Sequence, residues 1–347
     1  MVLQSQSYNP KTGRLYMRSR HRSGSKWPWI ALLGLIAAAV IYFGFLRDKA
    51  RQAVKPTRWA TARVEPPPAR QIKPVKVEQP HHQLEPHPQP SPQDAAVAAA
   101  MELSQKDTLV SARNALNDLL EGSAGPLTRP QTKALRIQLM HVNTKLIFSK
   151  RFYPDDPLVE VYVVKPGDVL SRATAPYKIP YQLVEHINEV KAKRIRDGQR
   201  LKMAKGPFHA VVLKSQYRLD VYLTGDDGKR VYICSFPVGL GEDDSTPLGK
   251  WIVRPGSKQI DPGWTNPRTG EQFAGGDQRN PIGRYWLGLE GVDEQTRPLS
   301  SYGIHGTIEP QTIGQLSSMG CIRLLPKDVE LLFYLLSEGD STVVVNP

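Results

Sequence analysis

Cysteine is scarce in this sequence, which contains only two, Cys234 and Cys321, among 347 residues. Two cysteines allow at most one disulfide, and that bond would require an oxidising compartment. The alternative is one buried structural thiol and one reactive thiol. Cys234 lies in the alternating run RVYICSFPVG, which is typical of a strand, and a buried free cysteine behaves there as a small hydrophobic residue. The pattern therefore favours the second alternative.

Metal-binding patterns are also lacking. The chain has eight histidines, of which His81, His82 and His87 lie among prolines in a segment that we interpret as a plain linker. The histidines and cysteines do not stand at the spacing of a metal-ligand cluster. We therefore expect neither a metal ion nor another cofactor.

Acidic residues are almost missing from the first 70 residues, which hold 13 lysines and arginines but only 2 aspartates and glutamates. The rest of the chain holds 33 basic and 31 acidic residues, so the net charge of +13 comes mainly from the N-terminal region. A near-neutral folded part argues against nucleic-acid binding. Basic residues on both sides of one apolar segment are typical of a membrane anchor.

That apolar segment, residues 27–46, reads WPWIALLGLIAAAVIYFGFL and has no charged residue. Its length suits the hydrocarbon core of a bilayer, and aromatic residues stand near both ends. We expect a retained transmembrane anchor after a basic tail, residues 1–26. A cleaved signal peptide is the alternative, although its apolar core is usually shorter. Basic residues are equally numerous on both sides, so they do not decide the orientation.

Two segments follow the expected anchor. Residues 47–93 contain ten prolines and are predicted to form an extended, semi-rigid linker, because they have too little apolar surface to fold. Residues 94–150 contain two runs with helical spacing, 94–121 and 128–148, separated by glycines. We expect a helical hairpin that serves as a packing or spacing module.

Residues 159–205 predict a strand, two short helices and a second strand. The segment resembles the LysM domain, and the resemblance implies binding to glycans that contain N-acetylglucosamine, as in peptidoglycan or chitin. The residues that carry the resemblance are Val164, Gly167, Asp168, Leu170, Tyr177, Pro180, Leu183, Ile187, Asn188, Gly198 and Leu201.

From residue 207 to residue 347 the pattern is mostly that of β-strands, with alternating apolar residues and turn signals between them. We expect a long loop over residues 257–280, which are rich in glycine, proline, asparagine and aspartate. An amphipathic helix is predicted over 326–339, and a closing strand follows it. At 141 residues, this segment is large enough to have a core of its own.

The stretch SMGCIR around Cys321 offers what a cysteine nucleophile needs. Gly320 lets the backbone approach a bound carbonyl, and the amides of residues 319–322 are candidates for an oxyanion hole. Arg323 stands two residues after Cys321, so on an extended chain it shares a side with the thiol and is suited to hold a carboxylate. The nucleophile also needs a base that lowers its pKa and holds the thiolate as an ion pair.

Only two histidines, His209 and His305, fall within residues 207–347. His209 lies at the edge of this segment, whereas His305 ends the strand-like stretch SYGIHG. The carbonyl of Gly306 is available to accept a hydrogen bond from the imidazole and fix its tautomer. His305 is therefore the candidate base. On spacing alone, a buried cysteine and a packed histidine without a catalytic role stay possible.

The motif IHGT…SxGCIRL closely resembles that of the L,D-transpeptidases with a YkuD domain, and FPVGLGEDDSTPLGKW and PIGRYWLGL extend the resemblance upstream. It implies a mainly β catalytic domain, a YkuD-like β-sandwich with one long helix, over residues 207–347. It also implies Cys321 as the nucleophile, His305 as its base and Gly306 as the residue that orients the base. The substrate-binding candidates are Arg323, Ser318, Gly320 and Tyr302.

The resemblance implies an enzyme that forms 3→3 cross-links between peptidoglycan stem peptides through a cysteine acyl-enzyme. Its partners are then stem peptides, glycan strands and the membrane, but no nucleic acid. Such substrates lie outside the cytoplasmic membrane, which places the C-terminal domains in the periplasm or cell-wall space of a single-pass membrane protein. Two alternatives remain: an L,D-carboxypeptidase that uses water as the acceptor, and an inactive protein that tethers the wall.

Overall fold

The computed structural model describes residues 6–8, 15–17, 91–104, 108–123, 125–225 and 227–347. The chain divides into two units, residues 1–82 and 83–347. In the first unit, strands β1 (Gln6–Tyr8) and β2 (Leu15–Met17) pair antiparallel. The expected anchor, residues 27–46, lies outside the described part, in which no helix is long and apolar enough to cross a membrane.

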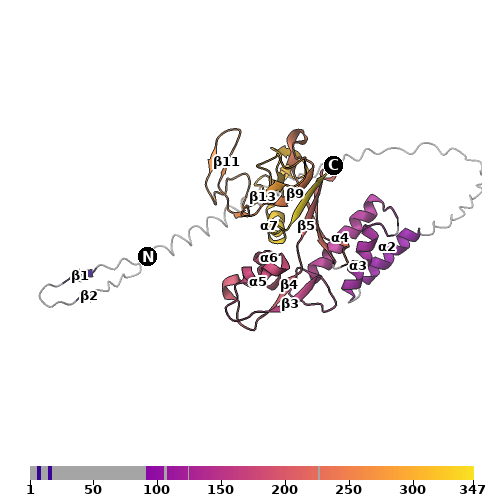
Figure 1. Cartoon of the computed structure of the whole chain (residues 1–347). Coiled ribbons are helices and arrows are strands. Elements are labelled where there is room, and N and C mark those ends of the chain that lie inside the picture. The colour runs from indigo at the N-terminus through magenta and orange to yellow at the C-terminus, as the bar shows by residue number, and fades with distance from the viewer. Residues whose placement is uncertain (1–5, 9–14, 18–90, 105–107, 124, 226) are drawn as a thin grey trace, which may run out of the picture. The chain divides into compact units, whose positions relative to one another are not determined.

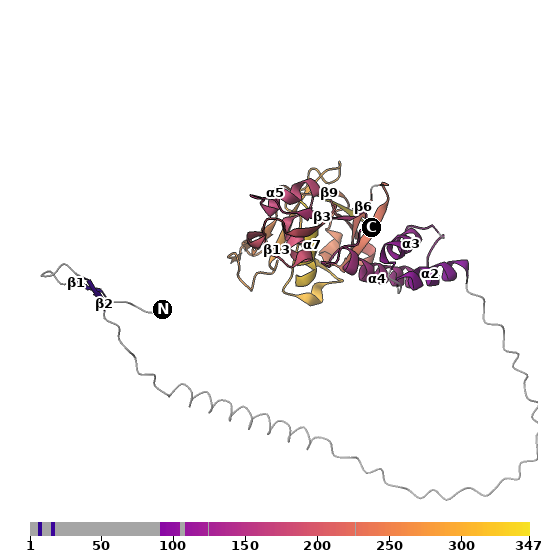
Figure 2. The ribbon, with the colours of Figure 1, turned by 90° about the horizontal axis from the view of Figure 1, so that it is seen from below.

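Three helices occupy the segment for which a hairpin of two was predicted: α2 (Pro92–Leu103), α3 (Leu109–Leu120) and α4 (Arg129–Leu146). The first predicted helix ends early because Ser104 caps α2, and its hydroxyl bonds back to the carbonyl of Met101 at 2.5 Å. A serine or threonine before α2 and α4 forms a capping box that fixes where each helix begins. Figure 2 shows the three helices gathered at one end of the second unit.

The next segment has the predicted order of a strand, two helices and a strand. It is made of β3 (Val159–Val163), α5 (Leu170–Thr174), α6 (Tyr181–Asn188) and β4 (Arg200–Ala204), with 3₁₀ turns η1 (Ala175–Tyr177) and η2 (Ala192–Arg194). β3 and β4 pair antiparallel, and the Asn188 amide joins α6 to the backbone of Lys202 through bonds of 2.8 and 2.9 Å. We call residues 159–204 the βααβ module; α6 contacts α7 (Pro326–Leu335) of the C-terminal domain (Figure 1).

One continuous sheet organises the C-terminal domain, in the strand order β16-β14-β13-β9-β17-β5-β6-β7, with β10 also paired to β13. The expectation of a mainly β domain is confirmed, and its strands are connected in one curled sheet. β17 connects the two halves of this sheet, because it pairs in parallel with β5 on one side and antiparallel with β9 on the other. The strands are β5 (His209–Leu213), β6 (Arg218–Thr224), β7 (Arg230–Pro237), β9 (Gly249–Val253), β10 (Gln259–Ile260), β13 (Tyr285–Gly291), β14 (Gly303–His305), β16 (Ile322–Arg323) and β17 (Thr342–Asn346).

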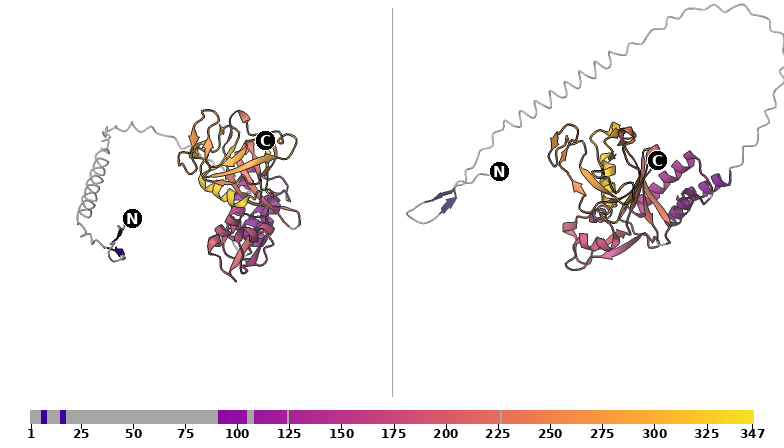
Figure 3. Two further views of the ribbon diagram at one scale, coloured as in Figure 1. Left: turned by 60° about the vertical axis from the view of Figure 1, so that its left-hand side comes forward. Right: turned by 45° about the horizontal axis from the view of Figure 1, so that its top comes forward.

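Helix α7, the yellow helix in Figure 3, packs against β13 and encloses the core beside that strand. Pro326 occupies its first turn, where a missing N–H costs nothing, and Val329, Leu332 and Phe333 are buried at helical spacing. The helix has 10 residues and ends at Leu335, four residues before the predicted end.

The segment predicted as a loop over residues 257–280 contains short strands. β10 extends the main sheet, and β11 (Trp264–Thr265) pairs with β12 (Gln272–Phe273) in a hairpin. Trp264 and Phe273 stack with ring centroids 5.9 Å apart. Outside this segment, β8 (Leu240–Gly241) pairs in parallel with β15 (Leu316–Ser318), and 3₁₀ turns η3 (Lys214–Gln216), η4 (Glu242–Asp244) and η5 (Pro310–Thr312) complete the domain.

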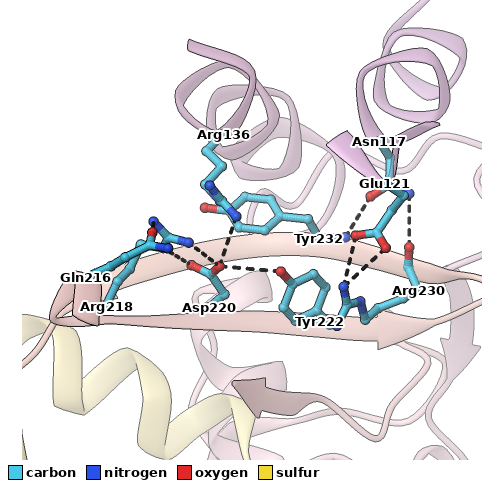
Figure 4. Close-up of polar contacts among 9 residues, drawn as sticks. All are labelled: Asn117, Glu121, Arg136, Gln216, Arg218, Asp220, Tyr222, Arg230 and Tyr232. Carbon is cyan, nitrogen blue, oxygen red and sulfur yellow. Dashed lines mark hydrogen bonds and ion pairs between the residues drawn. The ribbon is translucent and has the colours of Figure 1, made fainter. Parts of the chain in front are cut away.

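Helices α3 and α4 cover β7, the last strand of the sheet. The Asn117 side chain accepts a hydrogen bond from the Tyr232 N–H and donates one to the Arg230 carbonyl, both at 2.9 Å (Figure 4). Asn143 donates to the carbonyls of Tyr232 and Ile233 at 2.8 and 3.1 Å. The asparagines therefore satisfy backbone groups that a bare sheet edge would leave open to other strands.

A buried carboxylate joins the same two layers. Asp220 on β6 is fully buried, and it pairs with Arg218 at 2.7 Å and with Arg136 of α4 at 3.4 Å (Figure 4). A buried charge needs such partners, because its loss of hydration is otherwise uncompensated. The three-helix segment is thus packed onto the main sheet and is more than a spacer.

Candidate functional site

The candidate nucleophile and base come from neighbouring strands. β14 and β16 run parallel, with Ile304 opposite Ile322 and His305 opposite Arg323. Cys321 immediately precedes β16, so in this register it lies beside Gly303. Because side chains alternate along extended chains, Cys321, Arg323 and His305 point to the same face of the sheet. Gly303 has no side chain, and the ring of Trp286 occupies the space where its Cβ would stand.

The turn before Cys321 is locked by Ser318. Its hydroxyl donates to the Cys321 carbonyl at 2.6 Å and accepts from the Gly320 N–H at 3.2 Å. Ser318 is 2% exposed, and the structure places it as a support for the turn; its expected role in substrate binding stays a prediction. The amide of Gly320 is likewise engaged, which removes it from the candidate oxyanion donors.

Gly320 is needed where it stands. Its φ of +120° is a conformation that side chains disfavour, and a Cβ there would lie 2.7 Å from the Tyr302 ring. Tyr302 in turn packs against Trp251, with ring centroids 5.4 Å apart. Tyr302 is half-buried and packs against the turn at Gly320; its expected role in substrate binding stays a prediction.

His305 is 4% exposed, and its Nδ1 lies 2.6 Å from the Gly306 carbonyl. A carbonyl only accepts, so Nδ1 carries the proton and Nε2 keeps its lone pair. The ring stacks on Trp286 of β13, with centroids 5.8 Å apart and planes 17° apart. The sequence predicted the Gly306 contact but not Trp286, because nothing local indicates which residue lies across a sheet.

The protonation states differ from the expected ion pair. Burial lowers the pKa of His305 to about 4, and the nearby charge of Arg323 lowers it further, while the Gly306 and Ile282 carbonyls oppose the shift. Burial raises the pKa of the Cys321 thiol, although a Gly303 backbone hydrogen bond and Arg323 oppose this. Both groups are therefore neutral at pH 7 in the protein without a ligand.

The thiol and the imidazole share no hydrogen bond in the described part of the chain. The Cys321 Sγ instead has a weak contact with the Ser301 carbonyl at 3.9 Å. Catalytic hydrogen bonds are often long before substrate binds. The geometry fits a thiol that loses its proton only as it attacks.

Arg323 is the charged group nearest to this pair. Its side chain is 16% exposed, and its Nη1 lies 3.8 Å from a carboxylate oxygen of Glu309. Its Nε is buried without a hydrogen-bond partner among the described residues. A guanidinium with unfilled donors beside a thiol is suited to bind an anion such as a carboxylate. Glu309 was not predicted from the sequence.

The remaining candidates lie elsewhere. Cys234 and Cys321 are both free, and Cys234 is buried in β7, as the second alternative above predicted. The Nδ1 of His209 accepts from the Thr342 amide at 3.1 Å and lies 2.8 Å from the Thr342 hydroxyl. His209 thus ties β5 to β17. Across the described ranges, no three or more His, Cys, Asp or Glu side chains are grouped to hold a metal ion.

Comparisons with known proteins concern the segment of the chain that holds this site. The family profile of the YkuD L,D-transpeptidase catalytic domain matches residues 207–345. A Bacillus subtilis protein named L,D-transpeptidase YqjB is 31% identical over 141 residues, which cover 41% of this chain and 73% of that protein. A Bacillus licheniformis protein named L,D-transpeptidase YkuD is 27% identical over 186 residues, 52% of this chain and 94% of that protein.

Among solved structures, an L,D-transpeptidase from Mycobacterium smegmatis matches 43% of this chain and 64% of its own at 17% identity, with a TM-score of 0.30. That score is too low to add to the assignment, which follows from the sequence relatives and the family profile. The chain belongs to the YkuD family of L,D-transpeptidases, cysteine-dependent enzymes of peptidoglycan metabolism.

Proposed function

We propose that this protein forms 3→3 cross-links between peptidoglycan stem peptides through an acyl-enzyme on Cys321. The observation that carries the proposal is the placement of Cys321 and His305 on one face of two parallel strands, with the His305 tautomer fixed by the Gly306 carbonyl. The neutral imidazole then has a free lone pair with which to take the thiol proton.

The reaction proceeds in two transfers. As the Cys321 sulfur attacks the carbonyl carbon of the third stem residue, its proton passes to Nε2 of His305. The C–N bond to the terminal D-alanine breaks, and the leaving amine takes that proton. An amine of a second stem then attacks the thioester, the C–S bond breaks, and His305 receives the amine proton and returns it to the sulfur. A neutral Cys321 thiol and a neutral His305 imidazole suit this route, because the proton moves between them only when the substrate is present.

A covalent adduct tests the nucleophile. The intact protein is incubated with a carbapenem and weighed by mass spectrometry, and we expect one acyl group on Cys321. The Cys321→Ala variant serves as the control and should stay unmodified. A wild-type protein that forms no adduct while its thiol reacts with a small alkylating agent would count against the proposal.

Product analysis separates the proposal from an L,D-carboxypeptidase. Purified protein is incubated with stem tetrapeptides, and the products are separated by mass. Cross-linked dimers support transpeptidation, whereas monomers trimmed by one residue show that water is the acceptor. An inactive wall-tethering protein would give neither product. The unfilled donors of Arg323 beside the thiol favour an active enzyme, because a tethering protein has no need of them.

For the N-terminal regions we propose a supporting role. The βααβ module has the element order of a LysM domain, and we propose that it binds glycan strands and so raises the local concentration of stem peptides. Residues 27–46 would anchor the protein in the membrane, with residues 47–347 on the outer side. Co-sedimentation of Cys321→Ala with purified sacculi tests glycan binding independently of catalysis.

A further inference from the structure

The surroundings of Arg323 contain two carboxylates of different availability. Glu242 and Glu309 both favour the charged form of Arg323. Glu242 is already engaged in an ion pair with Arg268 at the tip of the β11–β12 hairpin. The Glu309 carboxylate has only Arg323 as a partner within the described ranges, and 52% of its side chain is exposed. Glu309 is therefore the carboxylate that a ligand can reach.

The position of Glu309 is fixed by its own backbone. Its N–H donates to the Thr307 hydroxyl at 2.9 Å, and its carbonyl accepts from the Thr312 hydroxyl at 2.7 Å. The segment begins at His305, two residues before Thr307. The carboxylate thus stands on an ordered turn that follows the candidate base in the chain, and it lies 3.8 Å from the Arg323 guanidinium.

We infer that Arg323 and Glu309 together recognise an acceptor whose amine and carboxylate are attached to the same carbon. Arg323 holds the carboxylate, and Glu309 attracts the ammonium. A separation of 3.8 Å between guanidinium and carboxylate leaves their hydrogen-bonding groups unused, so a zwitterion can satisfy both at once. The inference rests on the proposed function, because it assigns the acceptor side of that reaction.

The Arg323–Glu309 pair acts in the binding of the acceptor and not in the chemical step. The acceptor arrives as an ammonium and loses one proton to solvent before it becomes a nucleophile. A second proton passes to His305 as the new C–N bond forms and the C–S bond breaks. The contribution of Glu309 should therefore appear in the KM for the acceptor more than in kcat.

Two acceptors separate the charges cleanly. A stem tripeptide that ends in diaminopimelate carries a carboxylate on the carbon that bears the acceptor amine, and one that ends in lysine lacks only that carboxylate. We expect the wild type to prefer the diaminopimelate acceptor. Glu309→Gln should raise the KM for it about three- to fivefold, as for an exposed ion pair, and this change should exceed any change in the rate of acyl-enzyme hydrolysis. Glu294→Gln removes an exposed carboxylate that has no contact with Arg323, and it should match the wild type.

The outcomes distinguish the inference from the proposed function. No preference between the two acceptors in the wild type, or an unchanged KM in Glu309→Gln, would overturn the role of Glu309 while cross-linking continues. An equal loss of acylation, hydrolysis and transfer in Glu309→Gln would also overturn it, since that pattern indicates a structural role. A wild-type protein that forms no acyl-enzyme would instead refute the proposed function itself.

Discussion

His305 and Arg323 are direct cross-strand partners in the parallel pair β14–β16. The positive charge of Arg323 therefore acts on both reacting groups, and it lowers the pKa of the His305 imidazole and of the Cys321 thiol. The arginine thus discourages a charged base while it favours a charged nucleophile. This arrangement keeps the resting site uncharged at the histidine and makes the thiol sensitive to one side chain.

Removing Arg323 should make the thiol harder to ionise. In the wild type, the rate of Cys321 alkylation by iodoacetamide should keep rising with pH to beyond the ordinary thiol pKa, because burial raises the pKa of this group. Arg323→Met should move that midpoint still higher, since it removes a charge that favours the thiolate. Mass spectrometry against pH measures the modification of Cys321 alone.

Arg284→Met is the matched control, because Arg284 pairs with Asp261 on the exposed surface. Its alkylation profile should coincide with that of the wild type. A wild-type midpoint well below the ordinary thiol pKa, or a lower midpoint in Arg323→Met, would contradict this account. Either result would indicate that Cys321 and His305 form an ion pair in the free enzyme.

The buried imidazole should make stability depend on acid. The pKa of His305 is lowered to about 4 in the folded protein, against about 6.5 in an unfolded chain. Between these values the unfolded state binds more protons, so stability present above pH 6.5 is lost as the pH falls toward 4. The loss attributable to His305 reaches up to about 3 kcal/mol.

Urea unfolding of the wild type and of His305→Gln at several pH values measures this contribution. As the pH falls from 6.5 toward 4, the unfolding free energy of the wild type should decrease relative to that of His305→Gln. Other titrating groups cancel in the difference. Parallel curves for the two proteins would contradict the lowered pKa.

Substitution of Gly320 should disturb the turn that presents the thiol. In Gly320→Ala the new Cβ meets the Tyr302 ring at 2.7 Å with φ at +120°, so we expect a loss of roughly 2–4 kcal/mol and slower acylation by a carbapenem. Gly314→Ala is the control, because its φ is +83° but nothing lies within 4 Å of its Cβ. It should cost only about 1–2 kcal/mol. Equal melting temperatures for the two variants would remove the role assigned to Tyr302.

Because helix α3 covers the edge strand β7, its residue Asn117 should stabilise the catalytic domain. Asn117→Ala removes two hydrogen bonds and leaves the N–H of Tyr232 buried without a partner, which should cost about 2–4 kcal/mol. Asn114→Ala, on the exposed side of the same helix, should change stability by less than about 0.5 kcal/mol. Thermal unfolding followed by circular dichroism compares them. If both variants melt with the wild type, the helices are only loosely attached to the sheet.

Local sequence pattern was sufficient for much of the fold. Alternation predicted the strands around Val212, Val221 and Val343, and Pro326 marked the first turn of α7. It could not predict that β17 would join the two halves of the sheet, because pairing depends on residues far apart in the chain. The break at Ser104 was not predicted, although residues 104–108 are all polar.

The sequence by itself determined which residues are candidates for the chemistry and that Cys321 and Arg323 share a side, because alternation along an extended chain is a local property. It also determined that Gly306 can orient His305, since the two are neighbours. Only the tertiary structure decided that Arg323 lies beside His305, that the Ser318 hydroxyl forms hydrogen bonds within the turn, and that the Glu309 carboxylate lies near the Arg323 guanidinium. Strand register and loss of hydration arise from packing between distant segments, and those two effects set the charges in the site.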